Sequence, residues 1–218
     1  LPKHNLSDVI FKGIPLSDII TEGPMGIEFI SAGIGVLSLN DLTEEQIHLL
    51  VRSLNQLSGL CDVIIVDTGA GISSHVIDFA LASPEILLVA TPEPSSITDS
   101  YSLLKAILLN PVFNKKVTRI SLVANRVKNE SEAESVYTKL DGVVYQFLES
   151  HISFAGGVPQ DPNLEKAVRA QKIVSMAYPA SKSSRSFEDI AKKIMDYDDG
   201  GKPWGFSIRS LLDSLLKK

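Results

Sequence analysis

The stretch that decides the fold is Val63-Ile64-Ile65-Val66-Asp67-Thr68-Gly69-Ala70-Gly71, in which four apolar residues run into an aspartate and two glycines. An apolar run between Asp62 and Asp67 predicts a strand buried on both faces, as in a parallel sheet. An aspartate that follows such a strand lies at the carboxyl edge of the sheet, where open α/β sheets bind ligands. The stretch therefore predicts an α/β fold with a ligand site beside Asp67.

Short β-branched runs alternate with longer helical patterns along the rest of the chain, which favours a mostly parallel sheet covered by helices. We expect strands at 26–31, 63–66, 86–90, 120–124 and 154–158. Those at 63–66 and 86–90 are expected to be buried. We expect helices at 43–57, 73–82, 96–109, 131–149, 163–170 and 184–195, with capping boxes opening the third and fourth. This pattern predicts one domain over 1–195, a linker over 196–203 and a C-terminal helix over 204–218.

Composition and charge narrow the class of protein. The 218 residues are 44% hydrophobic and 22% charged, as in ordinary globular proteins. The formal net charge of −5 supplies no overall basic field that would recruit nucleic acid. One cysteine excludes an internal disulfide, and no run approaches the roughly 20 apolar residues of a membrane-spanning helix. A globular protein of a reducing compartment is the reading that these numbers favour.

The string from Val63 to Phe79, VIIVDTGAGISSHVIDF, fits the Walker B pattern and the turn that follows it. A strand-end carboxylate such as Asp67 can hold Mg²⁺, often through water. Gly69 and Gly71 would let the backbone approach a γ-phosphate and change conformation when that phosphate leaves. A tight strand-to-helix turn is the alternative explanation for the two glycines. The whole string closely resembles the Walker B and switch II region of MinD/ParA-type ATPases.

A second string narrows the resemblance to one branch. Residues 90–101 read ATPEPSSITDSY, which is similar to the TPEP-(S/T)-SITDAY stretch of FlhG-type proteins, also called YlxH or FleN. The two prolines that flank Glu93 stiffen the turn and hold its carboxylate at the sheet edge. The alternative is a rigid connection in which Ser96 and Asp99 only cap a helix.

The resemblance covers residues 5–195 and implies a three-layer, Rossmann-like P-loop NTPase fold with ATP and Mg²⁺ as cofactors. Asp67 would be the metal ligand, with Gly69 and Gly71 in the catalytic switch. Adenine would lie between the Asn125-Arg126 turn and the loop that contains Pro159 and Asp161. The Asn125 amide can both donate to and accept from the ring edge. An N-cap for the next helix is an equally good reading of Asp161.

No Gly-rich loop with a Lys-Thr ending occurs in the 218 residues, and 1–9 looks like the family segment after the second strand. We therefore expect this chain to lack the first strand–P-loop–helix–strand unit, and with it most of the phosphate cradle. The chain as given is expected to bind neither ATP nor Mg²⁺ normally. The absent strand is expected between the strands at Val63 and Ile120, where its loss would leave buried backbone groups without partners.

The resemblance also implies partners and a place in the cell. It implies a cytoplasmic protein that dimerises with ATP, associates with the inner face of the membrane, and contacts a flagellar GTPase, switch-complex proteins or a transcriptional activator. The C-terminal segment supports the membrane contact, because its apolar residues recur at helical spacing beside Arg209 and Lys217. Docking onto the domain itself is the alternative for this face. Its expected membrane-binding residues are Trp204, Phe206, Ile208, Leu211, Leu212, Leu215 and Leu216.

Two other functions compete with this reading. A ParA-type ATPase that partitions DNA needs a cluster of Lys and Arg on one face. The residues that could form this cluster are Lys182, Arg185, Lys192 and Lys193. They also suit the solvated face of an ordinary helix, and nucleic acid is the less favoured partner. The third reading is a non-catalytic module that acts only through protein contacts.

Overall fold

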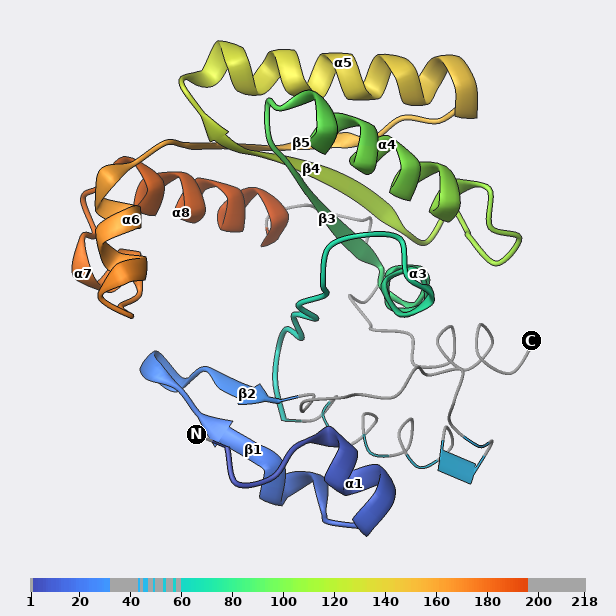
Figure 1. Cartoon of the computed structure of the whole chain (residues 1–218), viewed down its shortest axis with the longest axis vertical. Helices are drawn as coiled ribbons and strands as arrows, with labels where there is room; N and C mark the ends of the chain where they lie inside the picture. The colour runs from blue at the N-terminus through green and yellow to red at the C-terminus, as the bar shows by residue number, and fades with distance from the viewer. Residues whose placement is uncertain are drawn as a thin grey trace. The chain divides into compact units, whose positions relative to one another are not determined.

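The computed structural model describes residues 2–31, 43, 45–46, 49, 53, 57 and 60–195 (Figure 1). The expected linker and C-terminal helix, 196–218, lie outside the described residues. The chain forms two compact units. The hairpin unit holds the described residues of Leu1–Gly69 and Ser73–Ala82, and the sheet unit holds those of Ala70–Ile72 and Ser83–Gly205. The single domain expected over 1–195 stays a prediction.

The sheet unit is built on three parallel strands in the order β3-β4-β5, which are Glu85–Ala90, Arg119–Val127 and Ser153–Pro159. Helix α4 (Pro94–Leu108) joins β3 to β4, and α5 (Glu130–Leu148) joins β4 to β5. Helices α6 (Pro162–Arg169), α7 (Val174–Ala177) and α8 (Lys182–Met195) follow β5. The strands expected at 86–90, 120–124 and 154–158 are therefore confirmed, as are the helices expected around them.

The sheet unit has three layers, because successive glycines of β5 face helices on opposite sides of the sheet. A Cβ added to Gly156 would lie 2.9 Å from a side-chain carbon of Ile190 in α8, and one added to Gly157 would lie 2.7 Å from the Cβ of Ala133 in α5. Figure 1 shows α4 and α5 on one side of the strands and α8 on the other. Glycine at both positions lets the two helix layers approach the sheet closely.

Helix α4 begins two residues earlier than expected, and α5 begins one residue earlier. Pro94 is the first residue of α4, where its fixed φ suits a helix start, and the Ser96 hydroxyl instead accepts a hydrogen bond from the Thr91 backbone N–H at 3.0 Å. Asn129 caps α5 by accepting from the Glu132 backbone N–H at 3.0 Å. The two expected capping boxes do not form, because the earlier starts place each expected cap residue inside the first turn.

The hairpin unit contains α1 (Leu6–Lys12), a 3-10 turn at Leu16–Ile19, and a β-hairpin of β1 (Ile20–Glu22) and β2 (Glu28–Ile30), joined by the 3-10 turn Pro24–Gly26. Its last element is α3 (Ser74–Ala82). The expected strand at 26–31 and helix at 73–82 are confirmed as β2 and α3. The described positions of the expected 43–57 helix are helical, at residues 45, 46, 49, 53 and 57.

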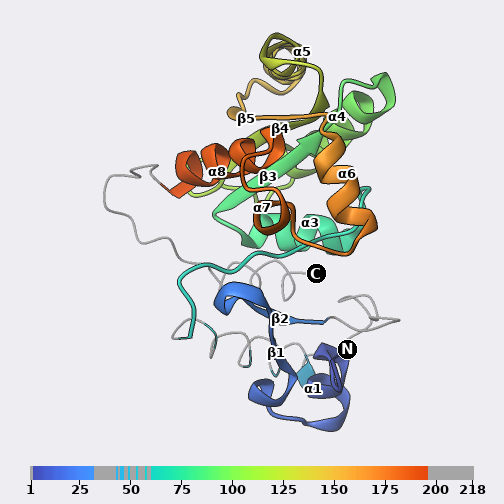
Figure 2. The ribbon, with the colours of Figure 1, turned by 90° about the vertical axis from the view of Figure 1, so that its left-hand side faces the viewer.

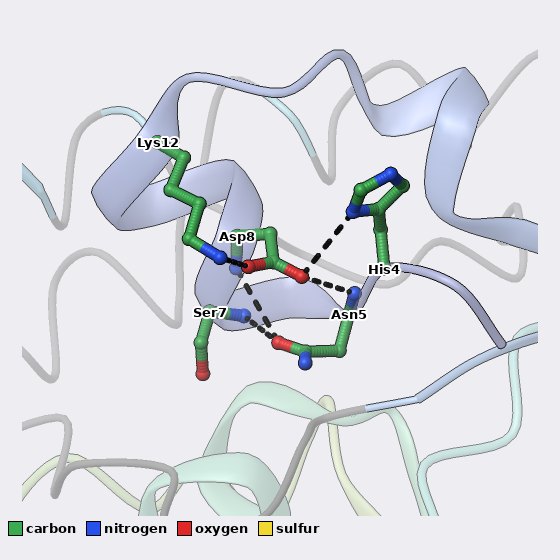
Figure 3. Close-up of polar contacts among 5 residues, drawn as sticks. All are labelled: His4, Asn5, Ser7, Asp8 and Lys12. Atoms are coloured by element: carbon green, nitrogen blue, oxygen red, sulfur yellow. Dashed lines mark hydrogen bonds and ion pairs between the residues drawn. The ribbon is translucent and has the colours of Figure 1, made fainter.

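A capping box fixes the start of α1 (Figure 3). The Asn5 side chain accepts hydrogen bonds from the backbone N–H groups of Ser7 and Asp8, and the Asp8 carboxylate accepts from the Asn5 N–H at 3.0 Å. Lys12 lies 2.6 Å from the same carboxylate and is the main cause that lowers the pKa of Asp8, and His4 lies 3.7 Å away. These contacts hold the helix whose Val9 enters the hairpin-unit core with Leu16, Ile19 and Leu57.

The stretch 63–66 is not a strand, and the expectation that it is buried on both faces is wrong. Ile65 is 86% exposed and Val63 47% exposed. Ile64 is the residue of this stretch that packs against the hairpin-unit core. A buried strand needs neighbours that pair its backbone N–H and C=O groups, and no described strand pairs with these residues. The apolar pattern indicated a sequence that can form a strand, but it carries no information on whether a neighbouring strand is present to pair with it.

The sheet also corrects where an additional strand could lie. Strand β4, which contains Ile120, is paired on both sides, so the strand expected between Val63 and Ile120 has no free edge beside Ile120. The edge of β3 opposite β4 carries no strand among the described residues. Leu87 and Val89 of β3 are 45% and 56% exposed, whereas Leu88 and Ala90 are buried. The expectation of a fully buried 86–90 strand therefore holds for one face of β3 only.

Candidate functional site

The carboxyl ends of β3, β4 and β5 meet at one edge of the sheet unit. Each strand leads there into the turn before its helix, at residues 91–93, 128–129 and 160–161 (Figures 1 and 2). Ligands of open α/β sheets bind outside this edge, because the turns there carry exposed polar groups on a rigid frame. All four residues expected to contact a nucleobase lie in or beside these turns.

The carboxyl end of β4 contains a bulge at Arg126. Asn125 pairs with Val158 and Val127 pairs with Pro159, so Arg126 is an extra residue between two adjacent pairs. Its backbone is left-handed, with φ 58°, and the Asn125 side chain accepts a hydrogen bond from its N–H at 2.9 Å. Bulges of this kind re-aim side chains beside functional sites. The Arg126 side chain is exposed at the carboxyl edge.

The turn after β5 is tied to the turn after β4 by Gln160. Its backbone N–H donates to the Val127 carbonyl at 2.9 Å, and its side-chain Nε2 donates to the Arg126 carbonyl at 3.2 Å. The structure thus brings together the two segments that were expected to hold adenine. The sequence placed Gln160 in the second loop but gave no sign of its contact with the first.

Asp161 is buried and its carboxylate is used by the protein. One oxygen accepts from the Asn163 N–H at 2.8 Å and caps α6, and the other accepts from the N–H and hydroxyl of Ser183 at 3.0 and 2.9 Å. The backbone hydrogen bond from Ser183 is the main cause that lowers the pKa of Asp161. The helix-cap reading of Asp161 is therefore confirmed, and a contact between Asp161 and adenine stays a prediction.

Glu93 lies in the turn after β3, as expected for a carboxylate held at the sheet edge. Its pKa lies below the ordinary value chiefly because the Thr91 hydroxyl donates a hydrogen bond to it, with smaller contributions from its own backbone N–H and the charge of Arg126. Glu93 and Arg126 thus attract each other across the turns of two neighbouring strands. The sequence gives no indication of this attraction.

The three residues expected in the catalytic switch are divided between the units. Asp67 and Gly69 belong to the hairpin unit, where Asp67 is exposed, and Gly71 belongs to the sheet unit. Gly71 has φ 107°, which residues with a Cβ rarely adopt, although a Cβ there would meet nothing within 4 Å. Glycine at 71 is thus required by conformation. The catalytic and metal-binding roles stay predictions.

The side chains at the carboxyl edge fit a nucleobase. The Asn125 oxygen accepts a hydrogen bond from the Arg126 N–H, which leaves its NH₂ group to donate, and Pro159 supplies an apolar surface beside it. Asp67 is chemically suited to a hydrated Mg²⁺, which needs few protein oxygens. No group of three or more His, Cys, Asp or Glu side chains that could hold a metal occurs among the residues that the structure describes.

The basic residues of α8 do not form an unoccupied cluster. Lys192 lies 2.6 Å from the Glu188 carboxylate in the same helix, and the Lys193 ammonium lies 5.4 Å from the centre of the Phe154 ring of β5. Lys182 and Arg185 are exposed near the start of the helix. Two of the four residues considered for DNA binding are thus engaged within the protein, which gives the DNA-partitioning alternative no specific support.

Comparison with known proteins identifies relatives over most of the chain, although no protein-family model matches it. The chain is 36% identical over 204 residues to the antiactivator FleN of Pseudomonas aeruginosa, which covers 94% of this chain and 71% of FleN. It is 32% identical over 178 residues to the flagellum site-determining protein YlxH of Helicobacter pylori, which covers 81% of this chain and 58% of YlxH. An uncharacterized ATP-binding protein of Methanocaldococcus jannaschii is 27% identical over 190 residues, 87% of this chain and 66% of that protein.

Solved structures share the fold. The cell division ATPase MinD of Pyrococcus furiosus matches with a TM-score of 0.64 at 19% identity, over 90% of this chain and 77% of that one. MinD of Pyrococcus horikoshii, complexed with Mg-ADP, matches with a TM-score of 0.61 at 17% identity, over 92% of this chain and 77% of that one. The fold is therefore that of the MinD-like P-loop NTPases, as the sequence predicted. Within that class, the chain belongs to the FleN/YlxH branch of the MinD/ParA-type ATPases.

Proposed function

We propose that this protein is an ATP-hydrolysing regulator of flagellar number and placement. The observation that carries the proposal is the 36% identity to FleN over 94% of the chain. The likeness to YlxH, a flagellum site-determining protein, and to a MinD bound to Mg-ADP supports it independently. The carboxyl-edge turns of the sheet unit supply groups of the right chemistry for the nucleobase.

In this proposal adenine lies against Asn125, Arg126 and Pro159, with Asp161 at the end of the same loop. Asp67 holds Mg²⁺, and Gly69 and Gly71 change conformation when the γ-phosphate leaves. Bound ATP supplies the phosphoryl group, and such transfer depends on positioning and charge stabilisation. The 218 residues contain no Gly-rich loop with a Lys-Thr ending, so we propose that on their own they bind Mg-ATP weakly.

We further propose a cycle between a monomer and an ATP-dependent dimer at the inner face of the cell membrane. The membrane contact would come from the 204–218 segment, whose apolar residues recur at helical spacing beside basic residues. Among the described residues, no helix is both long and apolar enough to span a bilayer. A flagellar GTPase, switch-complex proteins and a transcriptional activator are the proposed partners. The name antiactivator, given to FleN, favours the transcriptional activator among the three.

The test is complementation of a Pseudomonas aeruginosa strain that lacks FleN, with flagella counted per cell and Mg-ATP hydrolysis measured on a purified chain that joins these 218 residues to the P-loop unit they are expected to lack. We expect the wild type to hydrolyse ATP and restore the normal flagellar number, and Asp67→Ala to do neither. Asp62→Ala removes an exposed carboxylate from the other end of the same stretch and should behave as wild type. Failure of the wild type to hydrolyse ATP would overturn the proposal.

A further inference from the structure

One side chain joins the two turns that are proposed to hold adenine. The Gln160 amide nitrogen donates to the Arg126 carbonyl across 3.2 Å, although the two residues are 34 positions apart in the chain. A carbonyl oxygen can only accept, so the amide must face it with its NH₂ end. The backbone N–H of Gln160 donates to the Val127 carbonyl next to it, at 2.9 Å. Gln160 therefore donates hydrogen bonds to two successive backbone carbonyls at the end of β4, those of Arg126 and Val127.

Of the two residues whose carbonyls Gln160 binds, Val127 is paired with Pro159 in the strand ladder, and Arg126 lies outside the ladder. Arg126 is the bulged residue, left-handed at φ 58°, a conformation that residues other than glycine leave readily when their surroundings allow it. Its N–H is held by the Asn125 side chain. Two side chains thus hold Arg126 in this conformation. Asn125 accepts from its N–H, and Gln160, in the neighbouring loop, donates to its carbonyl.

The loop that carries Gln160 is itself fixed on both sides. Pro159 is paired with Val127 in the β4–β5 ladder, and the buried Asp161 is bonded to Asn163 and Ser183. The position of the Gln160 side chain is therefore set by a rigid frame. A side chain on a rigid frame can hold a strained residue such as Arg126 in one conformation.

We propose that Gln160 is a positioning residue for nucleotide binding, which holds the Asn125-Arg126 turn in the shape that receives adenine. The proposal rests on the proposed function. Loss of the Gln160 amide frees the Arg126 carbonyl and lets the turn relax, so nucleotide binding weakens. The rate of phosphoryl transfer in bound nucleotide is unaffected, because Gln160 lies at the nucleobase end of the site.

The test uses a chain in which these 218 residues follow the strand–P-loop–helix–strand unit that they are expected to lack, together with its Gln160→Ala and Gln160→Glu variants and Mg-ATP as the probe. Glutamate has nearly the same shape as glutamine but presents only acceptors when ionised. The matched control is Gln171→Ala, which truncates an exposed glutamine that makes no side-chain hydrogen bond within the described part of the chain. The measurements are the Kd and KM for Mg-ATP, kcat, and amide hydrogen exchange of the nucleotide-free protein at Arg126 and Gln160.

For both Gln160 variants we expect Kd and KM to rise about threefold to tenfold, as for one lost hydrogen bond, with kcat within about twofold of wild type. Exchange at Arg126 and Gln160 should quicken without nucleotide, and the control should match wild type in every measurement. An unchanged Kd overturns the proposal, and so does a raised Kd with unchanged exchange, which would mean a direct contact with the nucleotide. Wild-type protein that binds no Mg-ATP would instead overturn the proposed function and this inference with it.

Discussion

One oxygen of the Asp161 carboxylate accepts two hydrogen bonds from Ser183, at 3.0 Å from its backbone nitrogen and 2.9 Å from its hydroxyl. The other oxygen caps α6 through the Asn163 N–H. Ser183 is completely buried at the start of α8. A single carboxylate therefore fixes the starts of two helices, and the loop from Pro159 to Asp161 is anchored to the frame of the sheet unit.

Asp161→Ala should destabilise the protein strongly. It leaves two backbone N–H groups and one buried hydroxyl without their acceptor, and each unsatisfied group costs about 1–3 kcal/mol. Allowing for relaxation and water, we expect a loss of about 2–4 kcal/mol in the free energy of unfolding, measured with urea. Glu165→Ala, an exposed carboxylate in the first turn of α6, is the control and should cost less than about 0.5 kcal/mol. Equal effects of the two substitutions would contradict this role.

The same carboxylate predicts a pH dependence. Its pKa is lowered from the ordinary 3.8 by hydrogen bonds to its charged form, so the stabilisation is fully present above that value. It is lost as the pH falls through the folded-state pKa. The free energy of unfolding should therefore fall more steeply below pH 3.8 in the wild type than in Asp161→Asn. Subtracting the free energies of unfolding of the two proteins at each pH removes the contribution of all other carboxylates. Parallel curves of this free energy against pH would show that Asp161 does not titrate as described.

The close approach of α5 to β5 gives a third prediction. A Cβ at Gly157 would lie 2.7 Å from the Cβ of Ala133, so Gly157→Ala should lower the free energy of unfolding by about 1–3 kcal/mol. Ala133→Gly alone should cost about 1 kcal/mol through helix propensity. The double substitution should cost clearly less than the sum, because removing the Ala133 Cβ relieves the clash. Additive costs, measured by chemical denaturation, would rule out this contact as the cause.

Local pattern was sufficient for the elements that find their partners inside the described sheet. The runs around Ile120 and Phe154 are apolar and short, and both form strands because β3, β4 and β5 pair with one another. Val63 to Val66 has an equally strong apolar pattern, but no strand in the described part of the chain pairs with it. Strand formation depends on a neighbour's backbone as well as on the strand's own side chains, so the pattern alone could not distinguish the two cases.

The site was predicted to a similar extent. The sequence predicted that Asn125, Arg126, Pro159 and Asp161 lie together, because parallel strands bring their carboxyl ends to one edge, and their contact with a nucleobase stays a prediction. The Gln160–Arg126 hydrogen bond and the attraction between Glu93 and Arg126 were not found. Both join residues that are distant in the sequence, the first through the Arg126 backbone carbonyl and the second through its side-chain charge. Arg126 is left-handed without being a glycine, so the sequence does not indicate the bulge.

The 218-residue chain should bind Mg-ATP at best with a Kd of about a millimolar, because it contains no Gly-rich phosphate loop with its lysine. The groups at Asn125, Arg126 and Pro159 would contribute contacts to the nucleobase only. Adenosine should therefore bind within about threefold of Mg-ATP, since the phosphates add little. Titration calorimetry with both compounds measures this. Micromolar binding of Mg-ATP, or a large preference for it over adenosine, would show that the chain has a phosphate site elsewhere.

The last prediction concerns the 204–218 segment, which lies outside the described residues and rests on the sequence. Trp204 and Phe206 precede an aliphatic stripe at helical spacing, and Asp213 is its one acidic residue among the bases Arg209 and Lys217–Lys218. An aromatic anchor, an apolar face and positive charge are the features of a helix that lies in the interface of an anionic membrane. One short helix binds weakly, so an ATP-dependent dimer should bind much more tightly than the monomer.

Flotation of the full-length protein with anionic vesicles tests this segment. Leu212→Glu places a charge in the apolar stripe and should abolish flotation with Mg-ATP, as should a chain that ends at Lys202. Ser214→Glu adds the same charge on the polar side of the helix and is the matched control, which should keep most of the binding. The contrast between the two glutamates separates burial of the apolar face from simple loss of positive charge, because both lower the net charge equally. If Leu212→Glu and the shortened chain float as well as the wild type, the segment packs against the protein and does not anchor it.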